Sequence, residues 1–145
     1  MSSSVLEHGA ARIRPAAASD LPAVERLLTA SALPLDGVRE ALSDFVVAES
    51  DGELVGVAGL EVCCDDALLR SVAVKPEWRS RGVGRQLVTR AIANAESRGL
   101  RALYLLTTTA EHYFPGFGFR KITRDEVPQS VRETKEFTSA CPSTA

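Results

Sequence analysis

The fold of this chain is decided by residues 70–84, which read Arg70-Ser71-Val72-Ala73-Val74-Lys75-Pro76-Glu77-Trp78-Arg79-Ser80-Arg81-Gly82-Val83-Gly84. An apolar strand, a loop with two glycines and the start of a helix follow one another in this stretch. The strand extends back to residue 67 and is apolar on both faces, which is typical of a central strand. Apolar side chains at helical spacing from Val83 to Ala95 predict the helix, and Gly99 ends it.

The loop between this strand and this helix has the composition of an anion-binding site. Glycines let several backbone N–H groups turn toward one point, and a helix N-terminus adds partial positive charge. Arg79, Arg81 and Arg85 bring three further positive charges, so a diphosphate is the natural ligand. The chain has no Gly-Lys-Ser or Gly-Lys-Thr, and Leu87 stands where Gly-x-Gly-x-x-Gly needs its last glycine. The common P-loop and dinucleotide motifs are therefore excluded.

Outward from this unit, the pattern predicts an α/β (α+β) fold. The turn signals Asp51-Gly52 and Asp65-Asp66 predict an antiparallel meander in the front half. A strand–helix–strand crossover over 67–108 makes its two strands parallel. Strands are predicted at 11–15, 45–48, 54–62, 67–74, 101–108 and 117–122, and helices at 21–33, 36–43, 83–98 and 127–137.

Length and composition set the class of protein. The chain has 145 residues, of which 45% are hydrophobic and 25% charged, so we expect one globular domain at 11–145 after a disordered tail at 1–10. The net charge of −2 argues against nucleic acid as a partner. Since no stretch longer than nine residues is free of charge and the N-terminus has no basic segment, we expect neither a membrane span nor a signal peptide. A cytoplasmic location follows.

The cysteines and histidines predict neither disulfides nor a metal site. Cys63, Cys64 and Cys141 are an odd number of thiols without an export signal. His8 and His112, the two histidines, have no partner at metal-ligand spacing.

The residues quoted above resemble the GCN5-related N-acetyltransferase (GNAT) superfamily. Strand 70–74, Lys75-Pro76 and the loop 79–84 carry the resemblance, together with the opening stretch 13–22 and the late Gly118-Phe119. It covers roughly residues 11–137. The resemblance implies a mixed central sheet of six to seven strands, antiparallel in its front half and flanked by about four helices.

The resemblance also implies acetyl-CoA as the co-substrate. Loop amides from Arg81 to Arg85 would hold its pyrophosphate, and the backbone of Val72 and Val74 would pair with the pantetheine arm. The strands carrying Val74 and Leu105 would splay apart to admit that arm. The residues implied for acetyl-CoA are Val72, Ala73, Val74, Arg79, Ser80, Arg81, Gly82, Val83, Gly84 and Arg85.

Two narrower groups are similar to this chain. Residues 105–114, Leu-Leu-Thr-Thr-Thr-Ala-Glu-His-Tyr-Phe, followed by Gly118-Phe119, resemble the acetyltransferase domain of N-acetylglutamate synthase and, even more, the small arsenic-resistance acetyltransferases. Residues 57–61, 68–71 and 126–128, with Cys141-Pro142, also resemble this second group. Both resemblances imply a small substrate, a glutamate-like α-amino acid, with arsenic-related or phosphinothricin-type detoxification as the context. By superfamily analogy, residues 33–36 form part of the substrate wall.

Candidate catalytic residues are a base and an acid. Glu61, on a central strand among apolar residues, is a candidate base, with a solvent-facing strand position as the alternative. His112 has a suitable intrinsic pKa, with a surface loop as the alternative. A tyrosine commonly protonates the leaving thiolate in the superfamily, four residues before the Gly of the Gly-Phe pair. That position holds Phe114 here, and Tyr113, one residue away, is the candidate acid.

Substrate-binding residues are predicted on the strands beside the acyl-transfer site. Arg70 is the candidate clamp for a substrate carboxylate, because a guanidinium binds that group in bidentate geometry. The alternative is an ion pair of Arg70 with Asp65 or Asp66. Ser71, Thr107 and His112 complete the candidate set.

Two other functions stay open at this point. One is a protein or peptide N-acetyltransferase, and the other is a non-catalytic, regulatory acetyl-CoA-binding module, which Phe114 favours. No apolar strand follows the last predicted helix, whereas the superfamily usually ends with a seventh strand. A truncated sequence or a strand supplied by a partner in a homodimer would explain this.

Overall fold

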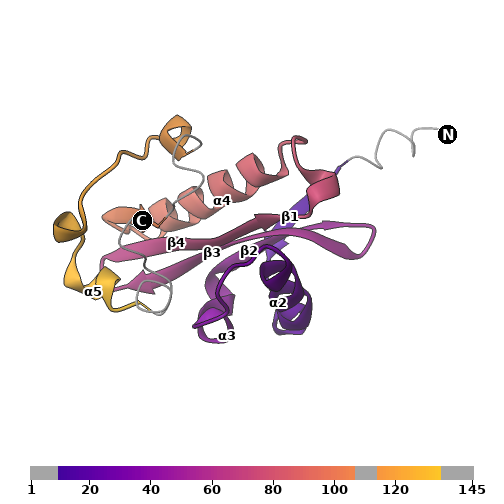
Figure 1. Ribbon diagram of the computed structural model, residues 1–145, viewed down its shortest axis with the longest axis horizontal. Helices are drawn as coiled ribbons and strands as arrows, with labels where there is room; N and C mark the ends of the chain where they lie inside the picture. Colours follow the sequence, from indigo (N-terminus) through magenta and orange to yellow (C-terminus); the bar gives the residue numbers. More distant parts are fainter. Residues whose placement is uncertain (1–9, 107–113, 135–145) are drawn as a thin grey trace.

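The protein forms one twisted mixed sheet with helices on both faces. A computed structural model describes residues 10–106 and 114–134 (Figure 1). The strands are β1 (Arg12–Pro15), β2 (Phe45–Ser50), β3 (Glu53–Cys63), β4 (Asp66–Val74) and β5 (Ala102–Leu105), in the order β1-β2-β3-β4-β5. The first four pair antiparallel, and β4 pairs parallel with β5. The predicted meander and the predicted parallel crossover are both confirmed.

The number of strands predicted from the sequence was too high. Within the described residues the sheet has five strands rather than six or seven, and 117–122 is not a strand. A 3₁₀ helix, η4 (Phe114–Phe117), takes up the start of that segment. Gly118 then adopts a φ of +95°, which interrupts an extended backbone.

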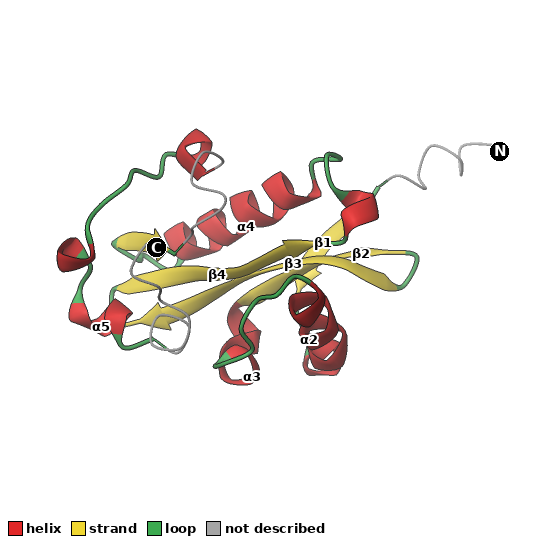
Figure 2. Ribbon diagram, in the orientation of Figure 1, coloured by secondary structure: helices red, strands yellow, loops and turns green. Residues whose placement is uncertain are grey.

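The α-helices are α2 (Leu21–Ala30), α3 (Val38–Ala41), α4 (Val83–Ser97) and α5 (Gln129–Arg132). Helix α4 covers one face of the sheet, and α2 and α3 cover the opposite face (Figure 2). The short 3₁₀ helices are η1 (Ala18–Asp20), η2 (Leu42–Asp44), η3 (Pro76–Trp78) and η5 (Arg124–Glu126). Of the predicted helix at 127–137, the described part contains only α5, because a 3₁₀ turn and Pro128 precede it and a turn follows it.

Helix α4 ends as its glycine predicts. Gly99 has a φ of +71° and donates to the Glu96 carbonyl, while Leu100 donates to the Ala95 carbonyl. These two bonds form a Schellman motif, which satisfies the last carbonyls of the helix. This motif ends α4, and the loop of residues 79–82 precedes its start.

Apolar side chains on both faces hold the sheet between its helices. On the α4 side, Leu60, Leu69 and Val88 are buried together, and on the α2 and α3 side, Val47 and Val57 are buried with helix residues. Burial of one such side chain stabilises the fold by about 1.5–3 kcal/mol. Val127, Val131 and Thr134 are buried, and the two valines pack the C-terminal segment against Leu68 near the start of β4.

Strand β4 carries a bulge in the middle of the sheet. The register with β3 changes between the pairs Val57↔Ala73 and Gly59↔Arg70. Ser71 lies in this bulge with a φ of +59°, a conformation that a residue with a side chain rarely adopts. The bulge turns Arg70 toward the α2 and α3 face while Val72 and Val74 pack toward α4.

Candidate active site

The parallel ladder between β4 and β5 stops halfway along β4. Its last pair is Leu69↔Leu105, and β4 continues to Val74. Among the described residues, the edge of 70–74 that faces away from β3 therefore has no strand partner. Val72 and Val74 are half-buried along this edge, and Ala73 packs into the opposite cluster beside Val57. The resemblance implies that the strands carrying Val74 and Leu105 splay apart here, and residues 107–113, which follow β5, lie outside the described ranges.

The loop that follows β4 presents backbone amides at the start of α4. Ser80 and Gly82 have φ values of +64° and +83°, and Gly82 is the N-cap of α4. In the part of the chain that the structure describes, the amides of residues 80–85 have no hydrogen-bond acceptor. A 15-residue helix that begins at such a loop forms an anion-binding nest.

Each of the three arginines around this nest is held by a different contact. The Arg79 Nε atom donates to the Val74 carbonyl at 3.2 Å. The Arg81 Cζ atom lies 4.9 Å from the ring centre of Trp78, and the Arg85 Cζ atom lies 5.6 Å from that of Phe117. All three side chains are exposed, and none pairs with an acidic residue in the described ranges. The nest therefore has an uncompensated positive charge.

A buried ion pair lies on the face of the sheet opposite α4. Arg70 is 2% exposed, and its Nη1 donates to Glu61 Oε1 at 2.9 Å. Its Nε donates to Ser71 Oγ at 3.0 Å, and its Nη2 lies 3.4 Å from the Pro34 carbonyl oxygen. Arg70 and Glu61, predicted separately as clamp and base, are thus in direct contact.

The carboxylate that pairs with Arg70 is neither of the alternatives considered from the sequence. Asp66 Oδ2 accepts from Arg101 Nη2 at 2.9 Å, which raises the pKa of the Arg101 guanidinium. Asp65 lies in the turn between β3 and β4, next to the exposed Cys64. Glu61 is the partner because it lies on β3 two residue pairs away from Arg70, on the same face of the sheet.

The loop between α2 and α3, which superfamily analogy implies as part of the substrate wall, reaches this ion pair. The Pro34 carbonyl contacts the guanidinium of Arg70, and the next residue, Leu35, is 39% exposed. On the other side, α5 packs beside Leu68 of β4. Glu61 and Arg70 therefore form a buried ion pair between the α2–α3 loop and the C-terminal segment, and we refer to this pair as the charged floor.

The candidate residues Thr107, His112 and Tyr113 lie outside the described ranges, as do His8 and Cys141. Phe114, which occupies the superfamily's tyrosine position, is described and is 9% exposed. Its ring meets Phe119 edge-on at 5.9 Å and lies 6.5 Å from Phe117. At this position the chain has an apolar packing residue and no phenol.

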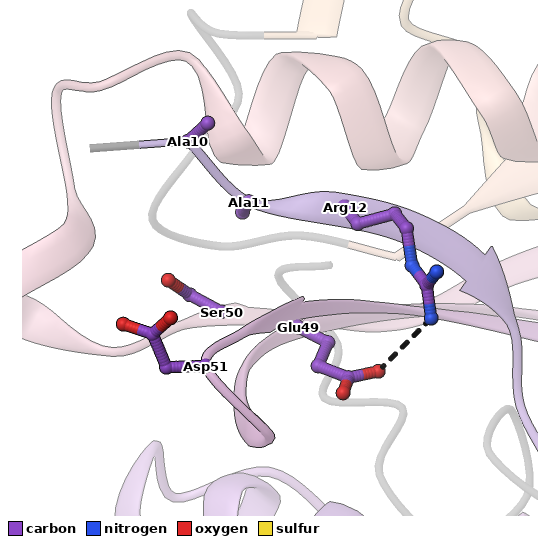
Figure 3. A pocket seen from close by; sticks show the side chains of 6 residues that line it. All are labelled: Ala10, Ala11, Arg12, Glu49, Ser50 and Asp51. Carbon is purple, nitrogen blue, oxygen red and sulfur yellow. Dashed lines mark ion pairs between the residues drawn. The ribbon is translucent and has the colours of Figure 1, made fainter. Parts of the chain in front are cut away.

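Other polar groups lie at the end of β3 and near the start of β1. Burial raises the pKa of the Cys63 thiol, and a hydrogen bond with Ser130 opposes this rise. Within 10–106 and 114–134 no three acidic, histidine or cysteine side chains gather into a metal-binding group. A shallow pocket near the start of β1 is lined by Arg12 and Glu49, an ion pair of 3.8 Å, and by Ala10, Ala11, Ser50 and Asp51 (Figure 3).

No helix in the described part of the chain combines the length and the apolar character that crossing a membrane requires.

The contact of Arg81 with Trp78 was not predicted from the sequence. The indole also packs against the cluster of Val83 and Leu87. The sequence indicates the contact of Trp78 with Arg81 only weakly, because the two residues are three positions apart within a tight turn. The contact of Arg70 with Pro34 has no such signal, because the two residues are 36 positions apart.

Comparison with known proteins places this geometry in a family. The model of the acetyltransferase (GNAT) domain matches residues 41–121. An amino-acid acetyltransferase of Neisseria meningitidis is 30% identical over 139 residues, which are 90% of this chain and 32% of that protein. One of Aeromonas salmonicida is 33% identical over 89 residues, or 60% of this chain and 20% of that protein. The chain thus spans about a third or less of the length of these relatives.

Solved structures agree with the sequence relatives. N-acetylglutamate synthase from Neisseria gonorrhoeae, complexed with coenzyme A and N-acetyl-glutamate, matches with a TM-score of 0.74 and 28% identity over 83% of this chain and 30% of that chain. A Mycobacterium tuberculosis protein in complex with CoA matches with a TM-score of 0.70 and 31% identity, covering 77% of this chain and 72% of that one.

Proposed function

Because this chain belongs to the GNAT acetyltransferase family, we propose that it transfers the acetyl group of acetyl-CoA to the α-amine of a small, glutamate-like amino acid. The observation that carries the proposal is the buried Arg70 of β4. It lies on the face opposite α4, directly after Leu69, the last residue of β4 that pairs with β5 in the described part of the chain. A fixed guanidinium there suits a substrate carboxylate.

The acetyl-CoA part of the proposal rests on the loop after β4. Its unpaired amides and the charges of Arg79, Arg81 and Arg85 suit the pyrophosphate. The unpaired edge of Val72 and Val74 suits the amides of the pantetheine arm, which would add to it like a strand. Solved relatives bound to CoA support the same ligand.

The substrate part rests on the charged floor and on the relatives' names. Arg70 would bind the α-carboxylate, and the α2–α3 loop at Pro34 would bound the side chain of the substrate. An amino-acid acetyltransferase and an N-acetylglutamate synthase are among the similar proteins. Detoxification of arsenic-containing or phosphinothricin-type amino acids is the narrower form of this proposal, based on the resemblance of residues 57–61 and 68–71.

The reaction is a direct acyl transfer in a site that aligns the two reactants. The amine nitrogen attacks the thioester carbonyl carbon, the C–N bond forms, and the C–S bond then breaks. Glu61, whose Oε1 holds Arg70, accepts the ammonium proton, directly or through a water. The thiolate takes a proton from Tyr113 or from water, since Phe114 offers none.

One observation favours a different function. Phe114 is buried in an aromatic cluster with Phe117 and Phe119, where the superfamily usually has its acid. A non-catalytic acetyl-CoA-binding module would need no acid at this position. Turnover distinguishes this alternative from the enzyme.

The test is the loss of thioester absorbance when acetyl-CoA is mixed with a panel of acceptors. The panel contains glutamate, phosphinothricin-like and arsinothricin-like amino acids, a polyamine and a lysine peptide. We expect turnover with the amino acids that carry a glutamate-like side chain. Turnover with the lysine peptide alone would assign a peptide acetyltransferase instead, and tight acetyl-CoA binding with no turnover would favour the binding module.

Arg70→Lys and Arg90→Gln separate substrate binding from general effects. Arg70→Lys keeps the charge but loses the bidentate geometry, so we expect KM for the amino acid to rise while the acetyl-CoA affinity stays unchanged. Arg90 is exposed on α4, away from the floor, and its substitution serves as the control. An unchanged KM in folded Arg70→Lys would remove Arg70 from the substrate site.

A further inference from the structure

We propose that Arg81, stacked on Trp78, binds the 3′-phosphate of CoA and makes the site select CoA over dephospho-CoA. This inference rests on the proposed use of acetyl-CoA, and it assigns one residue of the loop to one phosphate of that ligand. The position of Arg81, its stacking partner and its lack of a counter-ion carry the argument.

The stack orients Arg81 without using its hydrogen-bond donors. The Cζ atom of Arg81 lies over the indole of Trp78, 4.9 Å from its ring centre, and the contact is made with the π-face of the ring. All five N–H donors of a guanidinium lie in its own plane. A stacked arginine is therefore oriented in advance and keeps its full capacity for a bidentate phosphate contact.

The platform beneath Arg81 is part of the core. Trp78 ends η3, is half-buried, and packs against the cluster that contains Val83 and Leu87 of α4. The Trp78 amide donates to the Lys75 carbonyl at 2.9 Å, which closes the turn after β4. The indole therefore cannot move far, and it holds Arg81 at the rim of the loop.

The backbone on both sides of Arg81 is turned. Ser80 and Gly82 both lie in the left-handed region, with φ values of +64° and +83°. Glycine adopts this conformation easily, but serine pays a free-energy cost for it. Such strain persists where the surrounding structure enforces it, and here it places Arg81 over the indole.

The other loop arginines occupy different places. Arg79 is tied back to the end of β4 through Val74, and Arg85 lies in the first turn of α4 with its guanidinium over Phe117. The pyrophosphate of CoA is a diester with one negative charge on each phosphate. It suits the amides of residues 82–85 together with these two arginines. Arg81 precedes the N-cap, is exposed, and lies over Trp78 rather than against β4 or α4.

The chemistry of the 3′-phosphate matches this position. A phosphate monoester carries a charge of about −1.5 to −2 at neutral pH and offers three acceptor oxygens. The described acidic residues leave the charge of Arg81 uncompensated, so binding need not first break an ion pair. A planar, preorganised fork then makes a charge-assisted bidentate contact.

The experiment compares the affinities for acetyl-CoA and acetyl-dephospho-CoA. Trp78 is the one tryptophan of the chain, so its fluorescence reports directly on ligand contact with the stack. Calorimetry gives the same Kd values without depending on the fluorophore. In the wild type we expect acetyl-CoA to bind about tenfold more tightly or better, because a charge-assisted contact is lost without the 3′-phosphate.

The variants assign that difference to a residue. Arg81→Gln should weaken acetyl-CoA binding and leave acetyl-dephospho-CoA binding unchanged, which brings the ratio of the two Kd values near one. Arg85→Gln, the matched control within the loop, should weaken both ligands by the same factor. Arg90→Gln, farther along α4, should change neither.

Three results would overturn the inference. A wild-type Kd ratio near one would show that the 3′-phosphate is not bound, and equal weakening of both ligands in Arg81→Gln would assign Arg81 to the pyrophosphate. Both results leave the proposed function intact, since acetyl-CoA still binds. No binding of either thioester to the wild type would overturn the proposed function, and this inference with it.

Discussion

Arg70 and Glu61 are joined across neighbouring strands, with Arg70 Nη1 at 2.9 Å from Glu61 Oε1. The side chain of Arg70 has no exposed surface, and that of Glu61 is 14% exposed. Their strand partners are Gly59 for Arg70 and Leu68 for Glu61, so the two side chains meet diagonally on one face. Since a buried guanidinium without a counter-ion is costly, the candidate clamp depends on the candidate base for its place.

Glu61→Ala should therefore destabilise the fold and not only slow turnover. Removing one partner of a buried ion pair costs about 3–5 kcal/mol, because the other charge stays buried and uncompensated. The measurement is the free energy of unfolding in urea for wild type and variant. Glu61→Gln keeps a carbonyl acceptor for Arg70 and should lose less.

The control for this prediction replaces both partners. Glu61→Leu combined with Arg70→Met removes both charges and keeps similar volumes, so its stability should lie near that of the wild type. If the double variant loses the sum of the two single losses, the two residues are not coupled, and the dependence argued above is wrong.

Gly59 is required because Phe45 packs on it. A Cβ at Gly59 would lie 2.3 Å from Phe45 Cε1, and the ring of Phe45 is 1% exposed and cannot swing out to solvent. Gly59→Ala should cost about 1–3 kcal/mol, as overpacked cores do. A loss of this size lowers Tm by about 2–4 °C for each kcal/mol in a domain of this size.

Gly59→Ala with Phe45→Leu tests the cause. A smaller side chain at residue 45 gives the new methyl group room, so the cost of Gly59→Ala should shrink in the Phe45→Leu background. An equal Tm loss in both backgrounds would mean that the backbone of β3, rather than the ring, requires the glycine.

The sequence predicts the local elements better than the contacts between them. Strand β4, the loop and α4 follow from apolar spacing and two glycines, which are local signals. The ion pair of Glu61 with Arg70 depends on the register of β3 against β4 and on the bulge at Ser71. A one-residue change of register reverses the face of every side chain, and no local pattern reports a bulge at a serine.

The error at 117–122 has a similar origin. Alternating apolar residues there are typical of a strand, yet Phe117 packs against the α4-side cluster from the end of η4 and Phe119 from a coil. The prediction failed because the apolar alternation of 117–122, which reports that one side of the segment is buried, was interpreted as pairing of this segment with another strand. Gly118, with its positive φ, was the residue that argued against a strand.

Lowering the pH should weaken the ion pair that joins Arg14 of β1 to Asp20 of η1. Asp20 accepts two bonds from Arg14, at 2.8 and 2.9 Å, and one from the Ala17 amide at 2.7 Å. The hydrogen bonds from Arg14 are the main reason that the pKa of Asp20 lies below its usual value of 3.8. The hydrogen bond from the Ala17 amide lowers this pKa further. A lowered native pKa means that this stabilisation is complete above that value and is lost as the pH falls through the native pKa.

Asp20→Asn checks the sign of this effect. The difference in unfolding free energy between wild type and Asp20→Asn should be largest at about pH 7 and should shrink toward about pH 3. Asp125→Asn, at an exposed aspartate of η5, serves as the control. A difference that does not change with pH would show that Asp20 acts through its shape and not through its charge.

The two glycines that bound α4 separate stability from ligand binding. Gly82 begins the helix with a φ of +83°, and Gly99 follows its end with a φ of +71°. Neither has an atom within 4 Å of the position that a Cβ would take, so alanine at either site costs only backbone strain. That strain is about 1–2 kcal/mol, and the two variants should lose similar stability.

Their affinities for acetyl-CoA should differ. In Gly82→Ala the loop must change its φ to relieve the strain, which turns the amides of residues 82–85 away from their common point, and Kd should rise on the order of tenfold. Gly99→Ala leaves those amides in place, at the other end of a 15-residue helix, and Kd should stay unchanged. Calorimetry on both folded variants measures the two Kd values for acetyl-CoA. If Gly82→Ala binds as tightly as Gly99→Ala, the phosphates are held by the arginine side chains alone, and the backbone nest at the start of α4 has no part in binding.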